Sequence, residues 1–157
     1  SGSGIEWHLI EGDFLDHLEN APRPHCIFYD PFSLNTDSPL WSYQVFKRIF
    51  NHCAGRPAKL FTYSGSTMVR GALLAAGFYT GRGAGTGPKA DTTAAFTSLE
   101  IKNAEIKLLG AEWLDRFHRS SSKFRDEIPD DEKDQITNLI LNHPQFNKTA
   151  GAAGDGK

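Results

Sequence analysis

Three short polar motifs follow apolar stretches of this 157-residue sequence, and their side chains could hold a ligand. They are Gly12-Asp13, Asp30-Pro31-Phe32-Ser33 and Ser64-Gly65-Ser66. In open α/β sheets, ligands bind in the loops at the carboxyl ends of the strands. We therefore expect the three motifs to face one edge of a sheet, and this convergence carries more weight than any single motif.

Two carboxylates in these motifs each have two possible roles. Asp30 directly follows the apolar run Cys26–Tyr29. It could accept a hydrogen bond from a substrate amine and hold the nitrogen lone pair toward an electrophile, or it could merely cap the turn before Pro31. Asp13 could bind an adenine amino group or a ribose hydroxyl, although the commoner role of such a residue is to cap a helix.

The other reactive side chains have no spacing that indicates a site. The two cysteines are far apart and the six histidines show no metal-ligand spacing, so we predict no metal site and a reduced protein. The glycine-rich stretch 83–87 lacks the Gly-Lys-Ser/Thr ending of a phosphate-binding loop. We expect a flexible hairpin there, with Lys89 either solvated or touching a polyanion.

Alternating apolar runs predict the elements that position these residues. The predicted strands are Ile5–Ile10, Cys26–Tyr29, Leu60–Tyr63, Phe78–Arg82 and Thr93–Ser98. The predicted helices are Phe14–Asn20, a helix from Pro39 to Phe50 capped by Ser38, Thr67–Ala76 ended by Gly77, Ala104–Phe117, and Asp130–Leu141 capped by Asp130. Strands that alternate with helices predict an α/β fold with a mostly parallel sheet, and the last two strands predict an antiparallel pair at its edge.

Composition bounds the class of protein. Hydrophobic residues make up 39%, charged residues 23%, and the net charge is −2. These values fit a globular cytoplasmic domain without a membrane span, and any RNA contact would need a local basic patch. We assign residues 1–4 to a linker, 5–103 to the α/β core, 104–146 to a helical extension and 147–157 to a disordered tail.

Five motifs in the expected order resemble one enzyme family. They are Phe28-Tyr29-Asp30-Pro31-Phe32-Ser33, Pro39-Leu40-Trp41, Thr62-Tyr63-Ser64, Val69-Arg70 and Ala76-Gly77-Phe78. With them, the stretch from about Trp7 to Ser98 resembles the methyltransferase domain of the bifunctional tRNA 5-methylaminomethyl-2-thiouridine biosynthesis enzyme and its stand-alone relatives. The hairpin with Lys89 replaces that family's Gly-Phe-Gly-Arg-Lys segment but lacks its arginines.

The resemblance implies a Rossmann-like class I methyltransferase that uses S-adenosylmethionine. The methyl group would go to an amine nitrogen, the aminomethyl group of a tRNA wobble uridine. Asp30 would engage that amine. The resemblance also implies contacts for the remaining motif residues: Gly12, Asp13, Pro31 and Phe32 with the cofactor, and Ser33, Ser64 and Lys89 with the substrate.

The sequence starts at what would be the third strand of the family fold. The glycine-rich first loop and the acidic end of the second strand, which hold the cofactor in the family, lie outside it. We therefore expect this chain to form the C-terminal part of the fold and to bind the cofactor weakly or not at all on its own. We also expect the sheet to close up so that Ile5–Ile10 pairs directly with Cys26–Tyr29, or two copies of the chain to dimerise through exposed sheet edges, rather than Ile5–Ile10 to detach. A non-catalytic Rossmann-like binding or scaffold module is the alternative.

Overall fold

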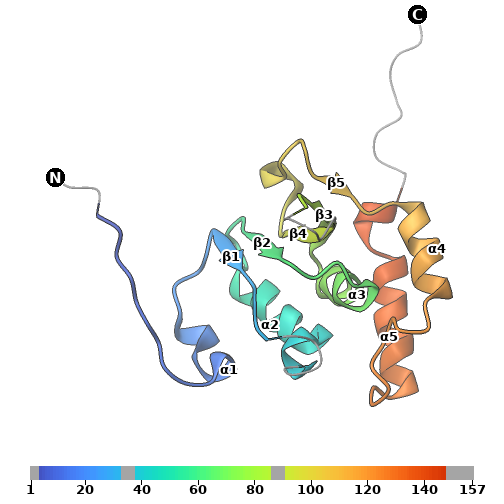
Figure 1. Ribbon diagram of the computed structural model, residues 1–157, viewed down its shortest axis with the longest axis horizontal. Coiled ribbons are helices and arrows are strands. Elements are labelled where there is room, and N and C mark those ends of the chain that lie inside the picture. The colour runs from blue at the N-terminus through green and yellow to red at the C-terminus, as the bar shows by residue number, and fades with distance from the viewer. Residues whose placement is uncertain (1–3, 33–37, 86–90, 148–157) are drawn as a thin grey trace, which may run out of the picture.

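A five-stranded mixed sheet forms the centre of the protein. The computed structural model describes residues 4–32, 38–85 and 91–147. The strands are β1 (Cys26–Phe28), β2 (Lys59–Thr62), β3 (Tyr79–Gly83), β4 (Thr92–Phe96) and β5 (Lys107–Leu108), in the spatial order β1-β2-β4-β3-β5. Figure 1 shows helices packed against one side of this sheet, which confirms the α/β class and the Rossmann-like arrangement.

The strand pairing differs from the predicted mostly parallel sheet, because three of the four strand pairs among the described residues are antiparallel. β1 and β2 pair in parallel, but β4 lies between β2 and β3 and runs antiparallel to both. β5 pairs antiparallel with β3 and forms the edge. The antiparallel strand predicted for the edge is therefore inside the sheet, where it gains hydrogen-bonding partners on both sides.

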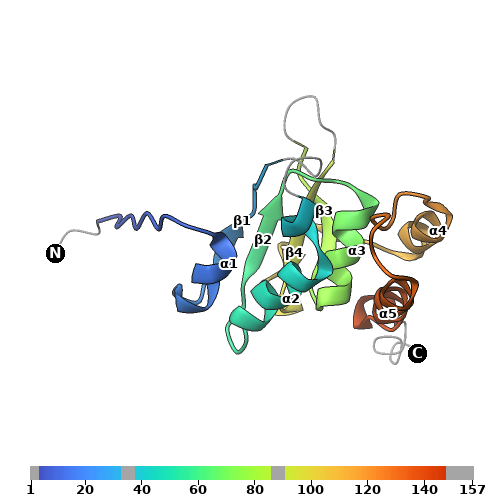
Figure 2. The same ribbon diagram turned by 90° about the horizontal axis from the view of Figure 1, so that it is seen from below.

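Four longer helices cover the sheet and extend it. They are α2 (Tyr43–His52), α3 (Thr67–Ala76), α4 (Ala111–Arg119) and α5 (Asp130–Leu141). A short α1 (Phe14–His17) continues into the 3₁₀ turn η1 (Leu18–Asn20), and the other 3₁₀ turns are η2 (Ser38–Trp41), η3 (Leu99–Ile101) and η4 (Pro144–Phe146). Figure 2 shows α2 and α3 against the strands, with α4 and α5 beyond α3.

Local signals explain why α3 begins and ends where it does. The Ser66 hydroxyl accepts a hydrogen bond from the backbone N–H of Val69, which caps the first turn. Gly77 follows the helix with a φ of 113°, the left-handed conformation that favours glycine. A Cβ there would also lie 3.1 Å from the ring of Phe50, so only glycine fits without strain.

Two apolar clusters meet at α3. The first joins the sheet to α2 and α3 and is centred on Trp41, Phe46, Leu60, Leu73 and Phe78. The second joins the other side of α3 to α4 and α5 and contains, among others, Leu74, Trp113, Phe117 and Ile140. Because α3 contributes to both, nearly all of its side chains are buried.

The segment Ile5–Ile10 is not a strand, contrary to the prediction. It runs away from the body of the molecule in Figures 1 and 2, and Ile5, Trp7 and Leu9 are more than four-fifths exposed. A strand needs a neighbour for its backbone hydrogen bonds, and none of the described strands pairs with this segment. In this single chain, Ile5–Ile10 is therefore detached from the sheet, and the predicted closure of the sheet onto this segment does not occur.

Two predicted helices begin later than expected. Ser38–Trp41 is a 3₁₀ turn, and α2 starts only after Ser42, whose hydroxyl accepts from the N–H of Val45. The indole of Trp41 turns into the core instead, and its Nε1 donates to the carbonyl of Phe32. The backbone from Lys107 to Leu108 pairs with β3, so the predicted helix Ala104–Phe117 is replaced by a strand and α4.

The remaining predicted elements are confirmed to within a few residues, except that Pro129 rather than Asp130 precedes the first turn of α5. In residues 4–32, 38–85 and 91–147, no helix combines the length and apolarity that a membrane span needs.

Candidate active site at the end of the central strands

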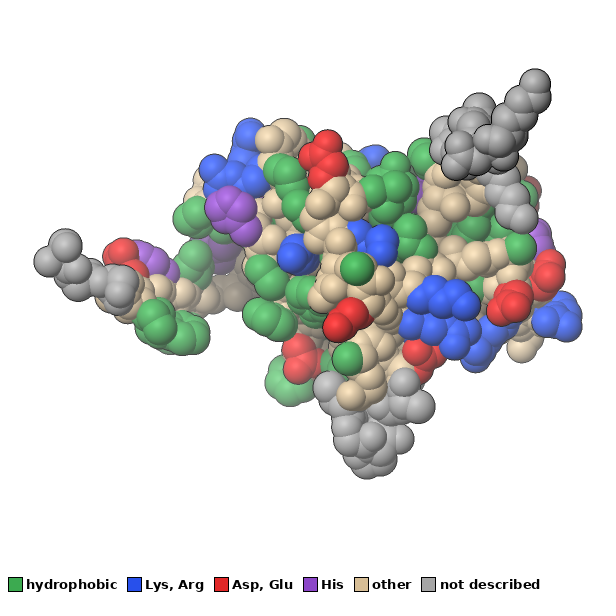
Figure 3. Space-filling model, turned by 90° about the horizontal axis from the view of Figure 1, so that it is seen from above, with side chains coloured by type: hydrophobic (Ala, Val, Ile, Leu, Met, Phe, Trp, Pro, Cys, Tyr) green, Lys and Arg blue, Asp and Glu red, His purple; other side chains and the backbone are tan. Residues whose placement is uncertain are grey.

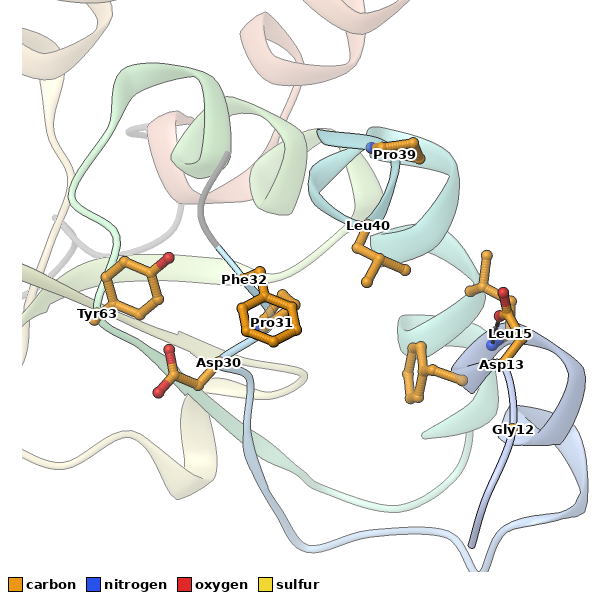
Figure 4. A pocket seen from close by; sticks show the side chains of 10 residues that line it. Gly12, Asp13, Leu15, Asp30, Pro31, Phe32, Pro39, Leu40 and Tyr63 are labelled. Carbon is orange, nitrogen blue, oxygen red and sulfur yellow. Dashed lines mark hydrogen bonds between the residues drawn. The ribbon is translucent and has the colours of Figure 1, made fainter. Parts of the chain in front are cut away.

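A wide hollow of about 820 Å³ opens at the carboxyl ends of β1 and β2. Its wall consists of Gly12, Asp13, Phe14, Leu15, Asp30, Pro31, Phe32, Pro39, Leu40 and Tyr63. Figure 4 shows Asp30 and Tyr63 at one end and Gly12, Asp13 and Leu15 at the other, with Pro31, Phe32 and Leu40 between them. The two carboxylates of the hollow, Asp30 and Asp13, therefore lie at opposite ends of it.

The Asp30 end is held by hydrogen bonds from the aromatic core. The backbone N–H of Tyr29 donates to the carbonyl of Phe61 at 2.8 Å and so continues the β1–β2 pairing to the residue before Asp30. The Trp41 indole donates to the carbonyl of Phe32 at 3.0 Å. The Tyr29 hydroxyl donates to the carbonyl of Leu40 at 2.5 Å. These bonds fix the backbone on both sides of Asp30 while its side chain stays exposed.

The Asp13 end of the hollow lies at the N-terminus of α1. Oδ1 of Asp13 accepts from the N–H of Leu15 at 2.8 Å, so the capping role is confirmed. Gly12 before it has a φ of 130°, and a Cβ there would lie 2.6 Å from Nε2 of His17. Position 12 therefore requires glycine, because a residue with a Cβ would be strained in this backbone conformation just before Asp13.

Tyr63 lies beside Asp30, and its environment keeps its phenol protonated. Burial, and to a lesser extent the negative charge of Asp30, raise the pKa of Tyr63 above its usual value of 10.0. Tyr63 is a site residue that the sequence reasoning missed, although it stands inside the Thr62-Tyr63-Ser64 motif. An aromatic residue at a strand end is usually part of the core, so the sequence offered no separate signal for it.

The structure brings Gly12, Asp13, Asp30, Pro31 and Phe32 around one hollow. Ser64 lies next to Tyr63 but does not line the hollow. Its side chain is buried, its hydroxyl is 3.4 Å from the N–H of Ser66, and its carbonyl accepts from the hydroxyl of Thr93. Ser33 and Lys89 lie outside the described residues.

The family model described as S-adenosyl-L-methionine-dependent methyltransferase matches residues 2–98, well over half of the chain. The chain belongs to this family. S-adenosylmethionine is the cofactor of this family.

A solved structure shares the fold. The crystal structure of MNMC2 from Aquifex aeolicus matches with a TM-score of 0.57 and 21% identity, over 83% of this chain and 41% of that chain. At this identity the likeness establishes the fold, and this chain spans less than half the length of that one. No curated protein matches the chain significantly.

The residues of the hollow fit the adenosyl part of this methyltransferase cofactor. Exposed rings of Phe14 and Phe32, with Pro31 and Leu40, offer apolar surface for a planar purine. The charged side chains among the described lining residues are Asp13 and Asp30, which suit amino and hydroxyl groups and a positively charged sulfur. No lysine or arginine among them could pair with the amino-acid carboxylate of the cofactor.

Proposed function

We propose that this chain carries the methyl-transfer end of a methyltransferase site, in which Asp30 engages an amine nitrogen of the acceptor. The observation that carries the proposal is the position of Asp30, which lies two residues beyond the end of β1 and lines the hollow opposite Asp13. When bound, S-adenosylmethionine supplies a methyl group on a positively charged sulfur. The family membership of the chain supports this reaction class.

The role of Asp30 follows from the chemistry of an amine nucleophile. Its carboxylate accepts a hydrogen bond from the amine N–H, which orients the nitrogen lone pair, and it can take the proton that the nitrogen loses. A phenol is protonated near neutral pH, and the raised pKa of Tyr63 keeps it so, which leaves the carboxylate of Asp30 as the proton acceptor of the two. Positioning of this kind needs no covalent intermediate with the protein.

For the acceptor we propose the aminomethyl group of a modified wobble uridine in tRNA, which the sequence resemblance implies. A local basic patch supports the proposal of a polynucleotide substrate, although the net charge of the chain is −2. Arg82 on β3 and Lys107 on β5 are both exposed and stand opposite each other in the strand register. An enzyme with this substrate would act in the cytoplasm, which forms part of the proposal.

The test replaces Asp30 in the full-length gene product. With radiolabelled S-adenosylmethionine and undermodified tRNA, Asp30→Asn and Asp30→Ala should lower kcat by about 10²- to 10⁴-fold while cofactor affinity stays within about threefold. Asp16→Asn is the matched control, because Asp16 is an exposed carboxylate of α1 that does not line the hollow.

Turnover of Asp30→Ala close to that of the unmodified enzyme would refute the role of Asp30. Methylation of a carbon or oxygen atom instead of nitrogen would refute the amine acceptor. The absence of any transfer by the full-length product would favour the scaffold alternative.

A further inference from the structure

The segment that forms one end of the hollow has little support from its neighbours in the sequence. Its lining residues are Gly12 and Asp13, which precede α1, and Phe14 and Leu15, which begin it. α1 has only four residues, and a helix this short is unstable on its own in water. Figure 3 shows the segment before α1 projecting from the body of the molecule, and Ile5–Ile10 pairs with none of the described strands. Contacts with more distant parts of the fold must therefore hold this end of the hollow in place.

An arginine of α2 supplies polar contacts of this kind. Nη2 of Arg48 donates to the carbonyl of Leu15 at 2.6 Å. Nε and Nη2 of the same side chain donate to Oε1 of Glu19 at 3.0 and 2.7 Å. The hydrogen bond from Arg48 lowers the pKa of Glu19, so that carboxylate is charged at neutral pH. One guanidinium group thus connects α2 both to α1 and to the turn η1 that follows it.

The backbone of Leu15 connects Arg48 to the carboxylate of Asp13. The N–H of Leu15 donates to Oδ1 of Asp13 at 2.8 Å, while its carbonyl accepts from Arg48. Arg48 is not among the described residues that line the hollow, whereas Leu15 and Asp13 both line it. Movement of the Leu15 backbone would therefore change where the Asp13 carboxylate lies in the hollow.

Apolar contacts also hold α1, but they leave its orientation less well defined. Leu18 is buried in the first apolar cluster, and Leu15 packs against that cluster. The rings of Phe14 and Tyr29 meet edge to face, with their centroids 6.2 Å apart. Burial of apolar surface is non-directional, whereas hydrogen bonds from a planar guanidinium fix an angle as well as a distance. The contacts of Arg48 therefore set the orientation of α1.

We propose that Arg48 is a positioning residue, which holds the Asp13 end of the hollow in the arrangement that binds the adenosyl part of the cofactor. It acts through the carbonyl of Leu15 and through Glu19. This inference rests on the proposed function, because that function gives the hollow its cofactor. It adds a residue on α2 that lies in none of the sequence motifs.

Hydrogen exchange on this chain tests whether Arg48 holds α1. In Arg48→Met, the amides of residues 14–20 should exchange about tenfold faster than in the parent chain, while the amides of α3 keep their rates. Arg56→Met is the matched control, because Arg56 also donates to a backbone carbonyl, that of Arg23 at 3.0 Å, and neither residue lines the hollow. Equal exchange of residues 14–20 in Arg48→Met and the parent chain would overturn the inference.

Cofactor affinity of the full-length gene product tests the link to the site. Arg48→Met should raise KM for S-adenosylmethionine and Kd for S-adenosylhomocysteine about tenfold, while kcat and KM for the acceptor stay within about twofold. Arg48→Lys should recover part of the affinity, since an ammonium cannot bond both Glu19 and the Leu15 carbonyl in a planar fork. Glu19→Ala removes one partner and should raise the same KM by less than Arg48→Met does.

A general loss of stability would give a different pattern. It would lower kcat through a smaller folded fraction and leave both KM values unchanged. That pattern in Arg48→Met, or an equal rise in cofactor KM in Arg56→Met, would overturn the inference. If the full-length product transfers no methyl group, the proposed function fails, and the Kd of S-adenosylhomocysteine for the parent protein and Arg48→Met still decides whether Arg48 positions a nucleoside site.

Discussion

At the scale of single residues, a buried arginine ties together the loops next to the site. Arg70 on α3 is 1% exposed. Its guanidinium donates to the hydroxyl of Thr93, the carbonyl of Thr92 and Oδ2 of Asp91, at 3.0, 2.9 and 3.3 Å. The Thr93 hydroxyl in turn donates to the carbonyl of Ser64 at 2.6 Å. Arg70 therefore connects β4 to the end of β2, beside Tyr63.

We predict that Arg70→Met lowers the free energy of unfolding by about 3 kcal/mol, because it leaves the buried hydroxyl of Thr93 and the part-buried carbonyl of Thr92 without their charged donor. Arg70→Lys should recover only part of this, since an ammonium cannot serve three acceptors in a fork. Urea unfolding followed by tryptophan fluorescence measures the change. Asp91→Asn is the control and should cost about 1 kcal/mol or less, because the Asp91 side chain is 36% exposed. A loss below about 0.5 kcal/mol in Arg70→Met would contradict the prediction.

At the scale of elements, a glutamine side chain extends the sheet where β5 ends. β5 pairs with Gly81 and Arg82 of β3, and just beyond it the N–H of Leu109 donates to the carbonyl of the fully buried Thr80 at 3.0 Å, which leaves the Thr80 N–H for a side chain. Oε1 of Gln145 accepts from the N–H of Thr80 at 2.7 Å, and its Nε2 donates to the carbonyls of Thr80 and Leu109, both at 2.8 Å. The amide thus serves as a strand partner for one residue and fastens η4 to the sheet.

Gln145→Ala should destabilise the protein by about 2 kcal/mol, because the buried N–H of Thr80 then has no acceptor. Gln145→Glu keeps the acceptor but loses the donor, so we expect an intermediate loss. Gln135→Ala, an exposed position of α5, serves as the matched control. Thermal unfolding by calorimetry gives the comparison, and equal stability of Gln145→Ala and Gln135→Ala would refute this role.

At the scale of the whole molecule, one side of the sheet is well covered and one edge is open. α3 contributes to both apolar clusters, so it packs against the sheet on one side and against α4 and α5 on the other. The outer edge of β1 has no partner among the described strands. The homodimer predicted from the sequence would use this edge, and it stays a prediction.

The stability of the whole fold should fall in mild acid because of His143. Burial lowers the pKa of His143 below its usual 6.5, against the opposing effect of a hydrogen bond with the Gly77 backbone. In mild acid the unfolded chain then binds more protons than the folded chain. The stabilisation that comes from burying a neutral His143 is therefore complete above about pH 6.5, and it is lost as the pH falls through the lower, folded-state pKa.

His143→Asn should flatten this pH dependence, because asparagine can still accept the hydrogen bond that His143 Nδ1 receives from the N–H of Gln145. His118→Asn, an exposed histidine of α4, should leave it unchanged. Urea midpoints between pH 5 and pH 8 provide the measurement. A slope in His143→Asn as steep as in the parent protein would show that other groups cause the loss.

The sequence by itself determined the elements whose hydrogen bonds are local. The span of α3 follows from Ser66 and Gly77, because helical bonds join residues four apart and caps act within three residues. The apolar run before Asp30 likewise predicted a strand with a carboxylate at its end, and the motifs around it predicted the family.

Only the tertiary structure decided what depends on distant partners. A strand is stable only beside another, which is why Ile5–Ile10 is not a strand, why Lys107–Leu108 is one, and why β4 lies inside the sheet. The same dependence hid Tyr63, which lines the hollow at Asp30 only because separate segments of the chain pack together there.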